Sequence, residues 1–132
     1  MESTGGRVEL AITVAGVDTD EDLRSLYRWL AGDDGLRGRV RLVDGPPEPG
    51  TMGSVPELIA IVLTQGGIGA AVAGTVVAWL RHRTKDVVCK VRRADGGSVE
   101  LSAKRVRTAD LAALQELVTD VARTLEPPPD TE

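Results

Sequence analysis

Hydrophobic and polar residues alternate along four stretches of the chain: 7–14, 37–43, 86–93 and 98–103. Such alternation is typical of β-strands that bury one face and expose the other. The last two stretches flank the turn sequence 94–97, which contains an Asp-Gly pair. An Asp-Gly pair between alternating runs predicts a β-hairpin. We therefore expect one small four-stranded sheet.

Two other segments, 19–31 and 109–125, repeat their apolar residues every three or four positions, which predicts amphipathic helices. Acidic residues at the start of the first segment suit the positive end of a helix dipole, and Gly32 is expected to end that helix. Thr108 or Asp110 is expected to cap the second helix. With both helices on one face of the sheet, the predicted fold class is α+β.

Between these parts lies an apolar segment, 55–83, in which Leu58 to Leu80 form 23 consecutive uncharged residues. One interpretation is a transmembrane helix, since about 20 apolar residues cross a bilayer. Trp79 then marks an interface, and the basic residues that follow place the C-terminal part in the cytoplasm. Gly66, Ala70, Gly74 and Ala78 recur every four residues, a spacing that favours close helix packing and self-association into a homo-oligomer.

The other interpretation is a buried helical hairpin that turns at Gly66-Gly67, with arms near 55–65 and 68–83. It is favoured because each flanking part alone has only two strands, which is marginal for independent folding. In that case the protein is expected in the cytoplasm. The two interpretations remain open, and both predict a central long apolar helix or helical hairpin.

These patterns divide the chain into four parts. We expect a strand-helix-strand unit over 1–54, the apolar helical segment over 55–83 and a strand-strand-helix unit over 84–125. Residues 126–132 contain three consecutive prolines and predict a disordered tail.

The composition argues against most catalytic and metal-binding functions. The chain has 132 residues, with 16 Lys and Arg, 20 Asp and Glu, one Cys and one His. A single Cys89 and a single His82 supply neither a disulfide nor a thiolate or multi-histidine metal site. Cys89 is expected to be a buried small hydrophobe. We expect no catalytic residues, no cofactor and no metal, and with only 2% aromatic residues no nucleic-acid partner.

Two surfaces are candidates for contact with a partner. The first is a basic run after the apolar segment, which can meet anionic lipid headgroups or an acidic protein. Its members are Arg81, Arg83, Lys85, Arg92 and Arg93. The second is a loop stiffened by proline, so that little conformational entropy is lost when it docks. Its members are Pro46, Pro47, Glu48 and Pro49.

The ordered combination of segments resembles a known family, the effector-associated constant component of bacterial conflict systems, which is frequent in actinobacteria. The resemblance covers about residues 7–125. It is carried by the sequences at 26–30 (LYRWL), 36–40 (LRGRV) and 46–53 (PPEPGTMG), by the end of the apolar segment at 78–81 (AWLR), and by the basic strand that leads to Asp95-Gly96.

The resemblance implies a non-enzymatic adaptor or scaffold that couples a variable effector, such as a peptidase, to its NTPase regulator. The partners it implies are proteins encoded nearby. A second function stays open beside it, namely a membrane-active component that oligomerises through its apolar helix.

Overall fold

The computed structural model describes residues 8–45, 56–63, 68–94 and 96–125. These residues form five strands and four α-helices, together with a short 3-10 helix, Asp34–Leu36. In chain order the elements are β1 (Val8–Ala15), α1 (Thr19–Ala31), β2 (Val40–Asp44), β3 (Pro56–Leu63), α2 (Ile68–Arg81), β4 (Val88–Arg93), β5 (Ser98–Ser102), α3 (Ala103–Thr108) and α4 (Leu111–Leu125). The predicted α+β class is confirmed.

The five strands form one sheet in the order β2-β3-β1-β4-β5, and every neighbouring pair is antiparallel. Helix α1 joins β1 to β2 across β3, and α2 joins β3 to β4 across β1. This interleaved order is the split β-α-β arrangement of ferredoxin-like folds. The connection through α1 passes over β3, and the connection through α2 passes over β1. The strands before and after the apolar segment therefore lie in one sheet.

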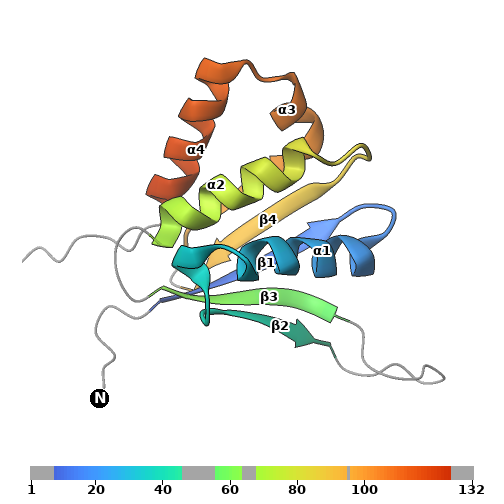
Figure 1. Cartoon of the computed structure of the whole chain (residues 1–132), viewed down its shortest axis with the longest axis vertical. Coiled ribbons are helices and arrows are strands. Elements are labelled where there is room, and N and C mark those ends of the chain that lie inside the picture. The colour runs from blue at the N-terminus through green and yellow to red at the C-terminus, as the bar shows by residue number, and fades with distance from the viewer. Residues whose placement is uncertain (1–7, 46–55, 64–67, 95, 126–132) are drawn as a thin grey trace, which may run out of the picture.

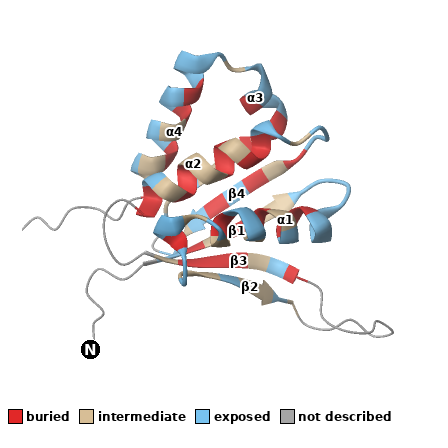
Figure 2. Ribbon diagram, in the orientation of Figure 1, coloured by how far each residue is buried: buried red, intermediate tan, exposed pale blue. Residues whose placement is uncertain are grey.

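All four α-helices lie on one side of the sheet (Figure 1). The core fills the space between the two layers, where the buried surfaces of helices and strands face each other (Figure 2). Alternate residues of the strands enter this core, and Leu10, Ile12, Ile59 and Ile61 are fully buried there. Burying such side chains supplies most of the driving force for folding.

The apolar segment does not form the expected long helix or helical hairpin. Its first part is strand β3, which lies between β2 and the central strand β1, and its second part is the 14-residue helix α2. The observed sheet therefore has five strands instead of the predicted four. None of the helices in the described ranges is long and apolar enough to cross a membrane. The turn expected at Gly66-Gly67 lies outside the described residues, as do the loop 46–55 and the tail 126–132.

The remaining elements follow the expected patterns closely. Cys89 pairs with Leu101 across the predicted hairpin, and its turn uses Gly96 at φ 126°, a conformation that side chains disfavour. Helix α1 ends at Gly32 as expected. The Asp110 carboxylate accepts a hydrogen bond from the Ala113 amide at 2.8 Å and so caps α4. Helix α3, which begins where the fourth predicted strand was expected to end, was not predicted.

Candidate docking surface

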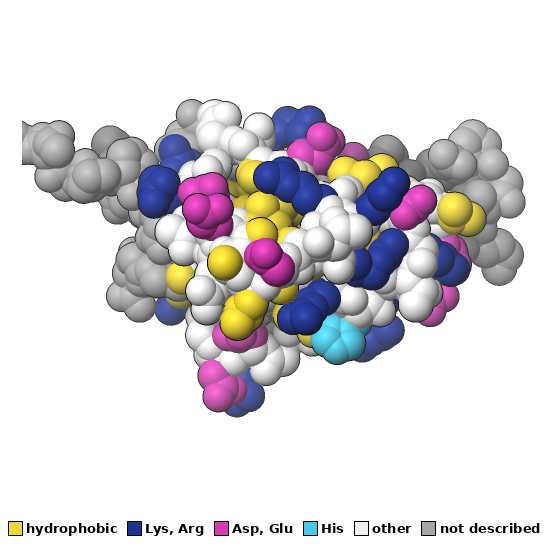
Figure 3. All heavy atoms as spheres, turned by 90° about the horizontal axis from the view of Figure 1, so that it is seen from above, with side chains coloured by type: hydrophobic (Ala, Val, Ile, Leu, Met, Phe, Trp, Pro, Cys, Tyr) yellow, Lys and Arg dark blue, Asp and Glu magenta, His cyan; other side chains and the backbone are white. Residues whose placement is uncertain are grey.

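The basic residues predicted as one contact surface lie in separate parts of the molecule. Arg81 and Lys85 are exposed at and just beyond the end of α2, whereas Arg92 is exposed on the sheet face that carries no helices. Viewed onto the helical end, Lys and Arg side chains are interspersed with Asp and Glu instead of forming one basic patch (Figure 3). Proximity in sequence therefore does not make these cations a single interface.

Arg83 is engaged inside the protein. Its Nη2 donates to Asp22 Oδ1 at 2.6 Å, and its guanidinium lies 4.9 Å from the centre of the Trp79 ring. The Trp79 indole in turn donates to Ser25 Oγ at 3.1 Å. Asp22 and Trp79 are both buried, so this network ties the first turns of α1 to the end of α2. Arg83 is therefore engaged within the protein with 24% of its side chain exposed, and its contact with a lipid or protein partner stays a prediction.

Arg93 also has an internal role. Its Nη1 donates to the carbonyl oxygen of Thr124 at 3.1 Å, near the C-terminus of α4. A cation at this end of a helix satisfies carbonyl groups that the helix leaves without partners and opposes the helix dipole. Arg107 of α3 donates through its Nη1 to the carbonyl oxygen of Arg83, two residues beyond the end of α2, at 2.6 Å. Arg93 thus links β4 to α4, and Arg107 links α3 to the segment that follows α2.

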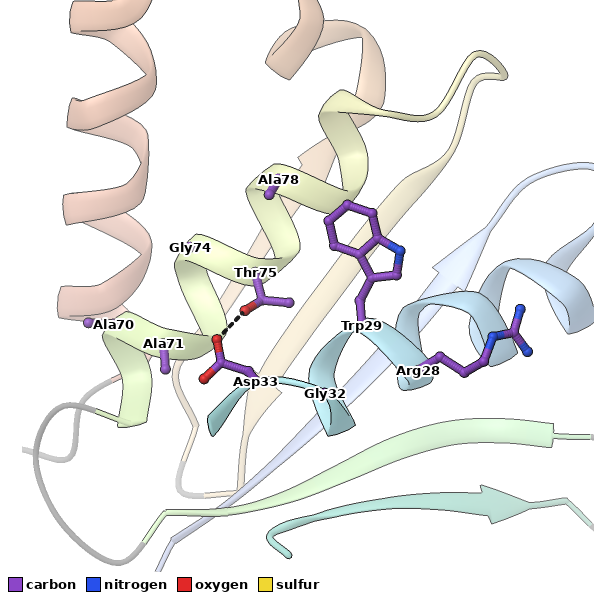
Figure 4. A pocket seen from close by; sticks show the side chains of 9 residues that line it. All are labelled: Arg28, Trp29, Gly32, Asp33, Ala70, Ala71, Gly74, Thr75 and Ala78. Carbon is purple, nitrogen blue, oxygen red and sulfur yellow. Dashed lines mark hydrogen bonds between the residues drawn. The ribbon is translucent and has the colours of Figure 1, made fainter. Parts of the chain in front are cut away.

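The described members of the predicted stripe of small residues, Ala70, Gly74 and Ala78, lie on α2 and line a space beside α1. Ala70 is exposed, Ala78 is half-buried, and a Cβ placed on Gly74 would meet no atom within 4 Å. The stripe forms the floor of an open hollow of about 600 Å³ between α1 and α2. In Figure 4 the Trp29 side chain points from α1 toward α2 above this floor, and Thr75 donates to Asp33 at 3.3 Å. Gly66 and the loop Pro46, Pro47, Glu48 and Pro49 lie outside the described residues.

The face of the sheet opposite the helices carries an apolar strip that sequence reasoning missed. We use "apolar strip" for the outward side chains of four residues on β1 and β3, namely Ala11, Leu58, Ala60 and Val62. Ala60 is only 6% exposed, and the other three are half-buried. The signal was present in the sequence, because residues 58–63 (LIAIVL) are apolar without alternation, a pattern typical of strands covered on both faces.

Charged residues border the apolar strip on both sides. In the sheet register Arg41 of β2 lies beside Ala60, Ala60 beside Ala11, and Ala11 beside Arg92 of β4. Lys90 follows on the same face of β4, beside Glu100 of β5. Arg41 also makes an exposed ion pair of 3.6 Å with Glu9. We call Arg41, Lys90 and Arg92 the basic rim. A shallow hollow of about 460 Å³ extends over part of this face, and its lining includes Arg41 and Arg92 of the rim, Ala11, Leu58 and Ala60 of the strip, and also Glu9 and Val43.

Cys89 and the acidic residues of the described ranges can be assessed as candidate chemical groups. Burial raises the pKa of the Cys89 thiol from its usual 9.0 to about 12, because desolvation disfavours the thiolate. Cys89 is thus the buried small hydrophobe that its place in the strand predicted. No three His, Cys, Asp or Glu side chains of the described ranges gather closely enough to hold a metal ion. An apolar patch with a polar border is instead typical of protein interaction sites.

Comparison with known protein families matches residues 15–122 to the family described as Effector Associated Constant Component 1. Comparison with curated proteins and with solved structures finds no match. The matched range runs from the end of β1 almost to the end of α4 and includes the rest of the sheet and all of α1, α2 and α3. The chain therefore belongs to the Effector Associated Constant Component 1 family.

Proposed function

We propose that this chain is a non-enzymatic adaptor that couples a variable effector to its regulator in a bacterial conflict system. The family description supports the general role, since it names a constant component associated with effectors. A peptidase-type effector and an NTPase regulator are the partners that we propose, both encoded near the adaptor.

The observation that carries the proposal is the sheet face without helices. A small protein of this kind stabilises its sheet by burying one face, and an antiparallel sheet usually exposes polar residues on the other. Here the centre of the exposed face is apolar at Ala11 on β1 and at the outward residues of β3, although none of the helices in the described ranges covers it. A surface of this composition is suited to binding another protein.

The experiment is co-purification of the full chain with each protein encoded beside its gene. We expect at least one stable complex, with the variant Leu58→Asp weakening it and the variant Thr119→Asp, on the exposed face of α4, serving as a matched control. Both variants should keep the far-ultraviolet circular dichroism spectrum of the parent protein.

Two results would overturn the proposal. One is the absence of a complex with any neighbour-encoded protein at micromolar concentrations. The other is hydrolysis of peptides or nucleotides by the purified chain that a point substitution in it abolishes.

A further inference from the structure

The apolar strip is as wide as one helix. Strands in a sheet are about 4.8 Å apart, so the three steps from Arg41 through Ala60 and Ala11 to Arg92 span about 14 Å between Cα atoms. An α-helix with its side chains is about 10 Å across. A helix laid along β1 and β3 would therefore cover the strip and bring its two flanks to the basic rim. It would also lie over Glu9, which faces the same side beside Val62 and is paired with Arg41.

We propose that the apolar strip is the docking site for one amphipathic helix of a protein partner, with an apolar stripe bordered on both sides by Asp or Glu. This inference rests on the proposed function for the partner's identity, but its chemistry comes from the strip and the rim. Apolar side chains of the helix would pack on Ala11 and Ala60, whose small size allows close approach. Its acidic flanks would meet Arg41 on one side and Arg92 and Lys90 on the other.

A second sheet fits this face less well than a helix. Two sheets that pack face to face bury the full width of both, and this would take Arg41, Lys90, Arg92 and Glu100 out of water. Burying charged groups is costly even where they are paired, as Arg41 is with Glu9. A single helix leaves these side chains at its edges, where they remain partly hydrated.

Nucleic acid and a second copy of the chain are also disfavoured. The described aromatic residues lie on α1 and α2, namely Tyr27, Trp29 and Trp79, so the sheet face offers no ring on which a base can stack. Two copies meeting through this face would bring one basic rim against the other, and like charges in close contact oppose association.

Photocrosslinking tests the shape of the occupant in the complex with the neighbour-encoded partner. Leu58 and Val62 are replaced, one at a time, by p-benzoylphenylalanine, and the crosslinked partner residues are identified by mass spectrometry. The two positions are four residues apart on β3, or about 13 Å. A helix along the strand then gives crosslinks centred roughly nine residues apart in the partner, because it rises about 1.5 Å per residue.

Other crosslinking results would overturn the inference. A separation of roughly four residues means an extended segment. Crosslinks to the chain itself mean a second copy, and crosslinks to nucleic acid mean that the face binds a polynucleotide. A complex that forms without crosslinks from either position overturns the inference while leaving the adaptor function in place.

A pair of probe peptides tests the chemistry without the natural partner. Both are 18-residue helices with the same Leu and Ala stripe, and one carries Glu and the other Lys at the flanking positions. We expect the Glu peptide to bind the full chain at least tenfold more tightly at low salt and to shift the amide resonances of Ala11 and Ala60. Equal affinity of the two peptides, or shifts confined to the helices, would overturn the inference.

Charge reversal gives the matched control. The double variant Arg41→Glu/Arg92→Glu should weaken binding of the Glu peptide at least tenfold and should favour the Lys peptide instead. The variant Arg105→Glu/Arg123→Glu changes the charge equally, but on α3 and α4, and should alter neither affinity by more than about twofold. If the peptides behave as expected but no neighbour-encoded protein binds, the proposed function fails and the helix site stands.

Discussion

The same strands present one face of the sheet to the helices and the other face away from them, and the two faces differ in how far their apolar side chains are buried. On the covered face Ile12, Ile59 and Ile61 are fully buried by the protein's own helices. On the other face of the same strands Ala11, Leu58 and Val62 remain half-buried, although their side chains are also apolar. The first face accounts for folding, whereas we propose that the second binds another molecule. Substitutions on opposite faces of one strand should therefore separate stability from binding.

The largest expected effect is on the covered face. Ile59→Ala removes a fully buried side chain next to the centre of the sheet and should lower the free energy of unfolding by about 3 kcal/mol. Leu58→Ala, the next residue on the same strand, should lower it by less than about 1 kcal/mol while weakening partner binding. Urea denaturation of both variants makes the comparison. Equal losses of stability would contradict the division between the faces.

This division was only partly visible in the sequence. Strands β2, β4 and β5 alternate between apolar and polar residues, because each buries one face and exposes charged groups on the other, so their extents were predicted within a few residues. Strand β3 does not alternate, and a short continuous apolar run does not distinguish a strand from a buried or membrane helix. Its run into α2 without an intervening charge then suggested one long helix or a helical hairpin.

The candidate site was harder to predict than the fold. The apolar strip joins residues from β1 and β3, which are neighbours only because α1 and β2 intervene in the chain and fold back. Nothing in the sequence places Arg41 and Arg92 on the two sides of that strip. The basic run after α2 was visible, but its periodicity does not show that Arg83 turns inward to Asp22 while Arg81 stays outside.

The second largest effect concerns that internal ion pair. Asp22 is 1% exposed, and its Oδ2 has no hydrogen-bond partner among the described residues. The buried charge of the Asp22 carboxylate therefore depends on Arg83 for its stabilisation. Arg83→Met should lower the free energy of unfolding by about 2 kcal/mol, less than for a fully buried pair because the Arg83 side chain is 24% exposed. The double variant Arg83→Met/Asp22→Leu should recover at least half of this loss. A double-mutant cycle by urea denaturation measures the coupling, and a cycle without coupling would contradict the role given to the pair.

Cys89 is expected to have a smaller effect on the free energy of unfolding, which appears only at high pH. Because Cys89 lies on the covered face, this effect concerns that face alone. The folded pKa of about 12 lies above the usual 9.0, so the folded state keeps a proton that the unfolded state loses between these pH values. Stability from this group is therefore complete below pH 9 and falls as the pH rises toward 12. Relative to Cys89→Val, the parent protein should lose about 1.4 kcal/mol of unfolding free energy between pH 7.5 and pH 10. A pH-independent difference would mean that water reaches the thiol.

The smallest expected effect concerns a second open surface, on α2, and tests whether a partner binds there or on the apolar strip. Gly74 lies in the middle of α2, and a Cβ there would meet no atom within 4 Å, so Gly74→Ala should raise the unfolding free energy by about 0.5–1 kcal/mol through the better helix propensity of alanine. Gly74→Leu should keep most of that gain but fill the hollow beside Trp29. If the apolar strip is the docking site, both variants bind the partner as the parent does. A loss of binding with leucine but not with alanine would instead place a partner helix on the small-residue stripe of α2, because close helix packing tolerates a methyl group there and excludes a larger side chain.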